Sequence, residues 1–254
     1  MRTTTLRRAA VVAVLVPAVA LPLAACSSGD DDGSGSSSGG SSQEGGDDGR
    51  SGGGEASGKP LTGKELKSAL LKSGEAGDYR VRYQKDGGPL DTDAVQVNRR
   101  ECQPIVDLFS PEPAHARAAY ASAALAESGV GTGGAFQQVV LSSYEEQDGA
   151  AKTFGGLRTA VGKCDGFVGS QGGAKEEQVT IEAGDSADVG VDAVQFTMRP
   201  KSSKAGSAMS VTVVRTAGST ATFASMALEG GKAKPMEGAV VREQHRKLEA
   251  AEKG

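Results

Sequence analysis

The sequence predicts an α+β protein in which helices pack on an antiparallel sheet. Strand-like segments follow one another in runs, as at 176–183, 191–199, 209–215 and 219–228, with no helical pattern between them. Amphipathic helical patterns separate these runs from the earlier strand-like segments. Consecutive strands favour an antiparallel sheet over the parallel sheet of an alternating fold.

Residues 1–25 have the pattern of a cleaved signal peptide. Three arginines give a positive start, and the apolar run 9–25 contains two prolines. The run is shorter than the ~20 residues that a membrane-spanning helix needs. An uncleaved anchor helix is the alternative, but the prolines and the lack of a basic flank disfavour it.

The end of this pattern together with the next residue, Leu23-Ala24-Ala25-Cys26, resembles the lipobox of bacterial lipoproteins. The resemblance implies cleavage before Cys26 and a diacylglyceryl group on its sulfur. Two or three acyl chains hold a protein stably at a membrane, whereas one gives only marginal binding. The alternative is simple secretory cleavage that leaves Cys26 unmodified.

Residues 26–58 form the predicted tether. After Cys26 this segment has no aliphatic side chain larger than alanine, and its seven acidic residues and one arginine give a net charge of −6. It cannot bury apolar surface, so we expect disorder. A calcium loop is disfavoured because the distal glutamate of such loops is missing. The remaining domain, 59–254, carries a net charge of about −1, which excludes a basic nucleic-acid footprint.

The domain is expected to begin with a helix. Thr62 and Glu65 have the spacing of a capping box, and Gly74 is placed to end the helix. Two half-buried strands follow, in "YRVRYQK" and "DAVQVN", and then a short helix in "CQPIVDLFS". Residues 114–126 are ambiguous, since alanine favours helix while the pattern also alternates.

The second half of the domain has clearer patterns. "AFQQVVLSSYEE" is typical of a strand, and Asp148 is expected to cap the helix that runs to Cys164. The segments 209–215 and 220–228 predict a hairpin that turns at 217–219. Pro235 is expected to open a final helix with Val240, Gln244 and Leu248 on one side.

With Cys26 consumed by lipid, Cys102 and Cys164 remain. Each lies at an end of a predicted helix, and an extracytoplasmic compartment permits disulfides. The residues favour one structural bridge over two free thiols. A redox pair or a metal site would need a C-x-x-C spacing or neighbouring histidines, which the sequence lacks around these cysteines.

Several segments in this order resemble the extracellular sensor domain of mycobacterial PknH-type kinases and related actinobacterial lipoproteins. They are "LLKSGEAGDY", "CQP", "FQQVVLSSYE", "AAKTFGGLRTAVGKC" and "VVRTAGSTATF". The resemblance implies an antiparallel sheet with packed helices and a cleft for an unidentified ligand. It also implies that Cys102 pairs with Cys164 and that 116–125 is a strand. The mycobacterial kinase domains of this family carry a second disulfide, and this sequence has no further cysteines to form it.

The residues give no catalytic constellation. His115 and His245 lack a second histidine or cysteine at metal-ligand spacing, and "VGSQGG" around Ser170 lacks a nucleophile elbow. "GVGTGG", with Gly129, Gly131 and Gly134, leads into a strand and is read as a loop. The basic loop with Arg199, Lys201 and Lys204 is read as a solvated hairpin tip, with contact to anionic envelope polymers or lipid headgroups as the alternative.

We therefore expect a lipid-anchored protein on the extracytoplasmic face of the cell membrane. Its folded domain is expected to be a non-catalytic, ligand-binding or sensor-like module with no cofactor and no metal. Its expected partners are the membrane, through lipid on Cys26, and a small-molecule or envelope ligand. An envelope hydrolase and a module that docks to another envelope protein are the alternatives.

Overall fold

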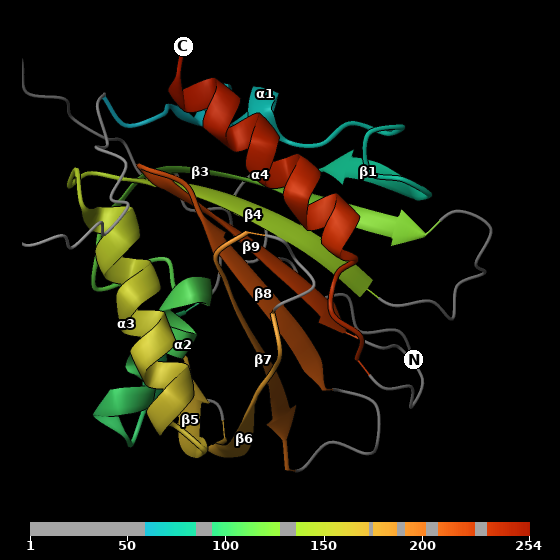
Figure 1. Ribbon diagram of the computed structural model, residues 1–254. Helices are drawn as coiled ribbons and strands as arrows, with labels where there is room; N and C mark the ends of the chain where they lie inside the picture. The colour runs from blue at the N-terminus through green and yellow to red at the C-terminus, as the bar shows by residue number, and fades with distance from the viewer. Residues whose placement is uncertain are drawn as a thin grey trace, which may run out of the picture. The chain divides into compact units, whose positions relative to one another are not determined.

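A nine-stranded antiparallel sheet forms the centre of the computed structural model (Figure 1). The structure describes residues 59–84, 93–127, 136–172, 175–186, 191–201, 208–226 and 233–254. All of them belong to the compact unit Ser51–Gly254. The predicted signal peptide, Cys26, the tether, the glycines of "GVGTGG" and Lys204 lie outside the described residues.

The elements follow the predicted order of helix, strands, helix, strands, helix, strands and helix. The strands are β1 (Tyr79–Tyr83), β2 (Val95–Val97), β3 (Arg117–Glu127), β4 (Phe136–Tyr144), β5 (Gly166–Gln171), β6 (Glu177–Ala183), β7 (Ala193–Pro200), β8 (Met209–Arg215) and β9 (Ser219–Met226). The α-helices are α1 (Gly63–Ala69), α2 (Gln103–Val106), α3 (Gly149–Lys163) and α4 (Gly238–Glu252), and short 3-10 turns η2 (Arg100–Cys102) and η3 (Asp107–Phe109) flank α2. This arrangement confirms the α+β prediction.

The strand order is β1-β3-β4-β9-β8-β7-β6-β5-β2. Strands β1 and β2 are neighbours in the sequence but form opposite edges of the sheet. The outer side of β1 is protected, because the N–H of Val81 donates to the hydroxyl of Ser73 and the N–H of Tyr79 donates to the carbonyl of Ala76. At the other edge β2 has three residues, and very short edge strands give little template for further pairing.

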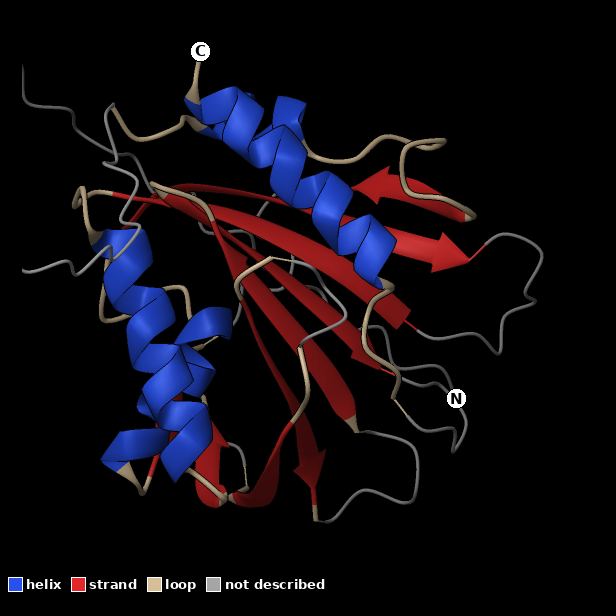
Figure 2. Ribbon diagram, in the orientation of Figure 1, coloured by secondary structure: helices blue, strands red, loops and turns tan. Residues whose placement is uncertain are grey.

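Helices cover both faces of the sheet (Figure 2). One pair of helices covers one half of the sheet on one face, and the other pair covers the other half on the opposite face. Helices α1 and α4 pack against β1, β3, β4 and β9 in one buried cluster, and α2 and α3 pack against β5 to β8 in another. On β8, Val214 belongs to the first cluster and Val213 to the second, so the clusters occupy opposite faces. The strands between them are therefore buried on both sides.

The ambiguous segment 114–126 is largely strand β3. Its alanines favour helix in isolation, but pairing with both β1 and β4 outweighs that preference. Ala119, Ala121 and Ala123 face the cluster that contains α1. A Cβ built on Gly63, at the start of α1, would lie 3.9 Å from the carbonyl oxygen of Tyr120. The small side chains let α1 approach the sheet closely.

Two helix boundaries and one helix cap differ from the predictions. Helix α1 ends at Ala69, and Gly74 lies beyond it with φ of +94°, in a turn that follows the helix. Asp148 stands at the N-cap of α3 but forms no capping hydrogen bond, and its carboxylate pairs with Lys152 at 2.9 Å. Helix α4 begins at Gly238, three residues after Pro235. Strand β5, which contains Ser170, was missed because its glycines interrupt the pattern.

Candidate functional site

A row of polar side chains crosses five adjacent strands on the face that carries α1 and α4. The strand register pairs Gln137 with Ser225, Ser225 with Ser210, Ser210 with Thr197, and Thr197 with Glu182. Side chains directly opposite in such pairs have Cβ atoms about 5 Å apart. Thr212, two residues after Ser210, extends the row on the same face. We call Gln137, Ser225, Ser210 and Thr212 the polar strip.

The polar strip is buried, although it consists of hydrogen-bonding side chains. Gln137 is 7% exposed, Ser210 3%, and Ser225 and Thr212 1% each. Three of its atoms have no hydrogen-bond partner, namely Oε1 of Gln137, Oγ of Ser225 and Oγ1 of Thr212. Such atoms are rare in native proteins, because leaving a buried polar atom unpaired costs about 1–3 kcal/mol. Three such atoms therefore lie on the neighbouring strands β4, β9 and β8.

The strip lies between an apolar region and solvent. On one side, Val139 and Phe223 occupy the next row of the same face and belong to the cluster under α1 and α4. On the other side, Thr197 is half-buried and Glu182 is exposed. Exposure therefore increases along the row from β9 to β6. Polar side chains therefore continue from the strip across β7 to the exposed end of the row.

Charged groups stand only at the margins of the strip within the described residues. Glu182 and Arg199 pair with each other at 4.0 Å on the outer side. At the β4 end, burial raises the pKa of the Tyr79 phenol, the Gln137 side chain opposes that rise, and the carboxylate of Glu237 adds to it. The Tyr79 phenol is therefore neutral at physiological pH. The strip itself is uncharged.

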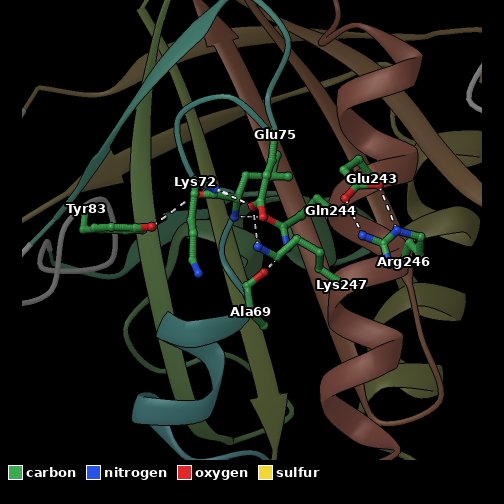
Figure 3. A network of polar contacts seen from close by, with 9 residues as sticks. Ala69, Lys72, Glu75, Tyr83, Glu243, Gln244, Arg246 and Lys247 are labelled. Carbon is green, nitrogen blue, oxygen red and sulfur yellow. Dashed lines mark hydrogen bonds and ion pairs between the residues drawn. The ribbon is translucent and has the colours of Figure 1, made fainter.

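A second polar network fixes α4 against the end of α1 (Figure 3). The amide of Gln244 accepts a hydrogen bond from the N–H of Leu71 at 3.0 Å and donates one to the carbonyl of Ala69 at 2.8 Å. Lys247 donates to Glu75 at 2.5 Å. These contacts hold α1 and α4 over the apolar rows beside the strip, so they position its border and leave its orphan atoms untouched.

The cysteines predicted to pair lie in the other half of the domain. Cys102 ends η2 and Cys164 follows α3, and the structure joins them by a disulfide with Cα atoms 5.3 Å apart. Both are buried in the cluster under α2 and α3. The bridge therefore ties the α2 segment to α3, on the face opposite the polar strip.

The histidines occupy structural positions. The Nε2 atom of His245 lies 3.0 Å from the carbonyl oxygen of Arg215, and its Nδ1 lies 3.9 Å from Glu249. His115 is half-buried on the segment before β3. In the described part of the chain, no three His, Cys, Asp or Glu residues are grouped as metal ligands. Among the same residues, no helix has the length and apolar character needed to cross a membrane.

One buried cation also has a structural role. Arg117 on β3 donates to the carbonyls of Asp107, Leu108 and Ser110 and to the hydroxyl of Ser142. Burial lowers the pKa of its guanidinium, with Asp107 opposing the shift. Because its donors already serve the end of η3, Arg117 is not a free site for an anionic ligand.

Sequence patterns missed the polar strip. Strand β8 is buried on both faces, so its hydrophobic alternation disappears. Ser210 and Thr212 consequently resemble the surface hydroxyls of any antiparallel strand. The available signal was the pair of hydroxyls at Ser210 and Thr212 in "MSVTVVR", but only the register brings them beside Ser225 and Gln137.

Comparison with known proteins supports the fold described above. No family model and no curated sequence matches the chain. Among solved structures, the chain is similar to the extracellular domain of PknH from Mycobacterium tuberculosis, with a TM-score of 0.52 and 10% sequence identity. The similarity covers 77% of this chain and 99% of that one. At this identity it shows the fold alone, and it confirms that the described domain has a PknH-like sensor fold.

Proposed function

We propose that this protein is a non-catalytic, extracytoplasmic module that binds a ligand at the polar strip. The observation that carries the proposal is the set of three buried, unpartnered atoms on Gln137, Ser225 and Thr212. They cost stability in the free protein, and a bound molecule would supply their missing hydrogen bonds. Their position beside a half-buried polar approach gives that molecule a route.

The location is proposed from the N-terminal sequence. A positively charged start, a short apolar run and Leu23-Ala24-Ala25-Cys26 support export, cleavage and lipid attachment at Cys26. The acidic tether would then hold the folded domain away from the membrane surface, since the 32 residues after Cys26 would have an end-to-end distance of about 30 Å if flexible. The likeness to an extracellular sensor domain supports this placement.

Neither alternative has comparable support. The ring of His245 contacts a backbone carbonyl, which does not favour an envelope hydrolase built on it. For a docking module, the most exposed large hydrophobic side chains described are Tyr83, Tyr120 and Phe136. The register places Tyr83 on the face of α1 and α4, and Tyr120 and Phe136 on the opposite face. They do not form one continuous patch.

Native mass spectrometry tests the proposal. The full-length protein would be purified from its own envelope in three forms: wild type, the double variant Thr212→Val/Ser225→Ala, and Thr222→Val. Thr222 is a matched control, because it is a buried threonine on β9 that faces the other side of the sheet. We expect a co-purifying small molecule on wild type and Thr222→Val only. Equal ligand on all three forms would refute the strip as its site.

A further inference from the structure

We infer that the polar strip recognises an uncharged, hydroxyl-rich molecule of the saccharide type. This inference rests on the proposed function and specifies its ligand class. It follows from the chemistry of the three unpartnered atoms, the position of the nearest charges and the exposure gradient along the row.

The unpartnered atoms call for both donors and acceptors. Oε1 of Gln137 accepts hydrogen bonds, whereas the hydroxyls of Ser225 and Thr212 both donate and accept. A ligand hydroxyl also does both, so it satisfies any of the three positions. A carboxylate or phosphate only accepts, and therefore leaves Oε1 of Gln137 without a donor.

The electrostatics disfavour a charged group at the same place. No ionisable side chain belongs to the strip, and Glu182 and Arg199, at the exposed end of the row, pair with each other. An ammonium group could donate to all three atoms, but the carboxylate described at the β4 end, Glu237, already interacts with the Tyr79 phenol. Burying an unpaired charge is far more costly than burying a neutral hydroxyl that finds a partner. The strip therefore favours the binding of a neutral ligand.

The surroundings continue the polar lining of the strip. Val139 and Phe223 border the strip on the same face but are buried under α1 and α4, and Gln195 lies opposite Thr212 in the register. Thr197 and Gln195 are half-buried, so polar groups continue from the strip toward solvent. A sugar presents several hydroxyls along one edge, which matches this row of polar side chains.

Three probes that share one ring and differ in charge test the inference. Glucose is neutral, glucosamine is cationic and glucuronate is anionic. Their binding to the full mature chain would be measured by calorimetric titration, with thermal shift as a second readout. We expect glucose to bind at least tenfold more tightly than either charged probe, a difference of about 1.4 kcal/mol. We expect Thr212→Val to lower the affinity for glucose roughly fivefold, which is the effect of losing one ordinary hydrogen bond. Thr222→Val should leave the affinity for glucose unchanged.

The outcomes separate the ligand class from the site. If a charged probe binds as tightly as glucose and Thr212→Val weakens both, the class is wrong and the strip remains the site. If glucose binds equally to wild type, Thr212→Val and Ser225→Ala, the strip is not the site and the proposed function fails with it. If glucose does not bind at all while the co-purifying molecule from the envelope is retained by the strip, the saccharide class is overturned.

Discussion

Gln244 on α4 accepts a hydrogen bond from the backbone N–H of Leu71, which lies 173 residues earlier in the chain. The same side chain donates to the carbonyl of Ala69, so one glutamine satisfies two backbone groups at the end of α1. Gln244 is fully buried, and so is Leu71. The glutamine thus does for α1 what a further helical turn would do, and it couples the first helix of the domain to the last.

Gln244→Met should therefore be strongly destabilising. Methionine has a similar size but leaves the N–H of Leu71 and the carbonyl of Ala69 buried without partners, at about 2–5 kcal/mol in total. The free energy of unfolding would be measured by urea denaturation. Arg246→Gln is the control, because Arg246 is exposed and pairs with Glu243 on the same helix. That control should change stability by about 0.5 kcal/mol or less. Equal stability of both variants would contradict the role given to Gln244.

The helical features of this contact could be predicted from the sequence. The spacing of Val240, Gln244 and Leu248 predicts that they share one face, and all three are buried. The capping box of Thr62 and Glu65 is also present, with the Glu65 carboxylate 2.7 Å from the N–H of Thr62. These features depend on residues three or four apart. Local sequence therefore determines them.

The pairing of strands that are far apart in the sequence could not be predicted from the sequence. Nothing near Val95–Val97 indicates that β2 lies at the edge opposite β1, because that depends on strands that follow much later. The polar strip has the same origin, since Gln137 and Ser210 become neighbours only through β9. Gln244 was predicted to share one side of its helix with Val240 and Leu248, but its partners on α1 were not predicted. The fold class followed from local patterns, whereas the site depended on register.

Removing the unpartnered hydroxyls should stabilise the free protein. Thr212→Val and Ser225→Ala each remove a buried polar atom that has no partner, and we expect a gain of about 1–3 kcal/mol per substitution. Ser143→Ala is the contrasting variant, because the buried Ser143 hydroxyl donates to the carbonyl of Leu61 at 2.6 Å. It should lose about 1 kcal/mol. Urea denaturation of ligand-free protein would measure all three, and a loss in the strip variants would show that their hydroxyls are bonded.

Cys102 and Cys164 should be oxidised in the exported protein. Mass spectrometry without reduction should show their peptides joined, and finding both cysteines alkylated before reduction would refute the bridge. The bridge spans a sequence separation of 62 residues, so its loss should cost about 4 kcal/mol in the chain-entropy model. The double variant Cys102→Ser/Cys164→Ser, compared with wild type in urea, measures that cost without leaving a single reactive thiol.

The contact between Glu75 and Lys247 should make stability depend on acid pH. The pKa of Glu75 is lowered from its usual 4.5, first by the hydrogen bond from Lys247 and then by that from the backbone N–H of Lys72. A lowered folded-state pKa means that the contribution is present above about pH 4.5 and is lost as pH falls through the folded-state value. Glu75→Gln should flatten the fall in Tm below pH 4.5. Because both groups reach solvent, the difference should be small and should shrink in high salt. An identical pH profile for the two proteins would contradict it.

Lipid attachment makes a prediction that is independent of the fold. Cys26→Ala should prevent acylation, because the sulfur that would carry the diacylglyceryl group is gone. The variant should then accumulate as an unprocessed precursor or a secreted product instead of the mature membrane-bound form. Fractionation and intact-mass measurement would identify which form is present. A deletion of residues 30–56 is the control: it keeps Cys26 and removes most of the acidic segment, so membrane association should persist and the Tm of the domain should barely change. A cleaved Cys26→Ala product that stays in the membrane fraction would refute the lipid anchor, because two acyl chains are what stable retention requires.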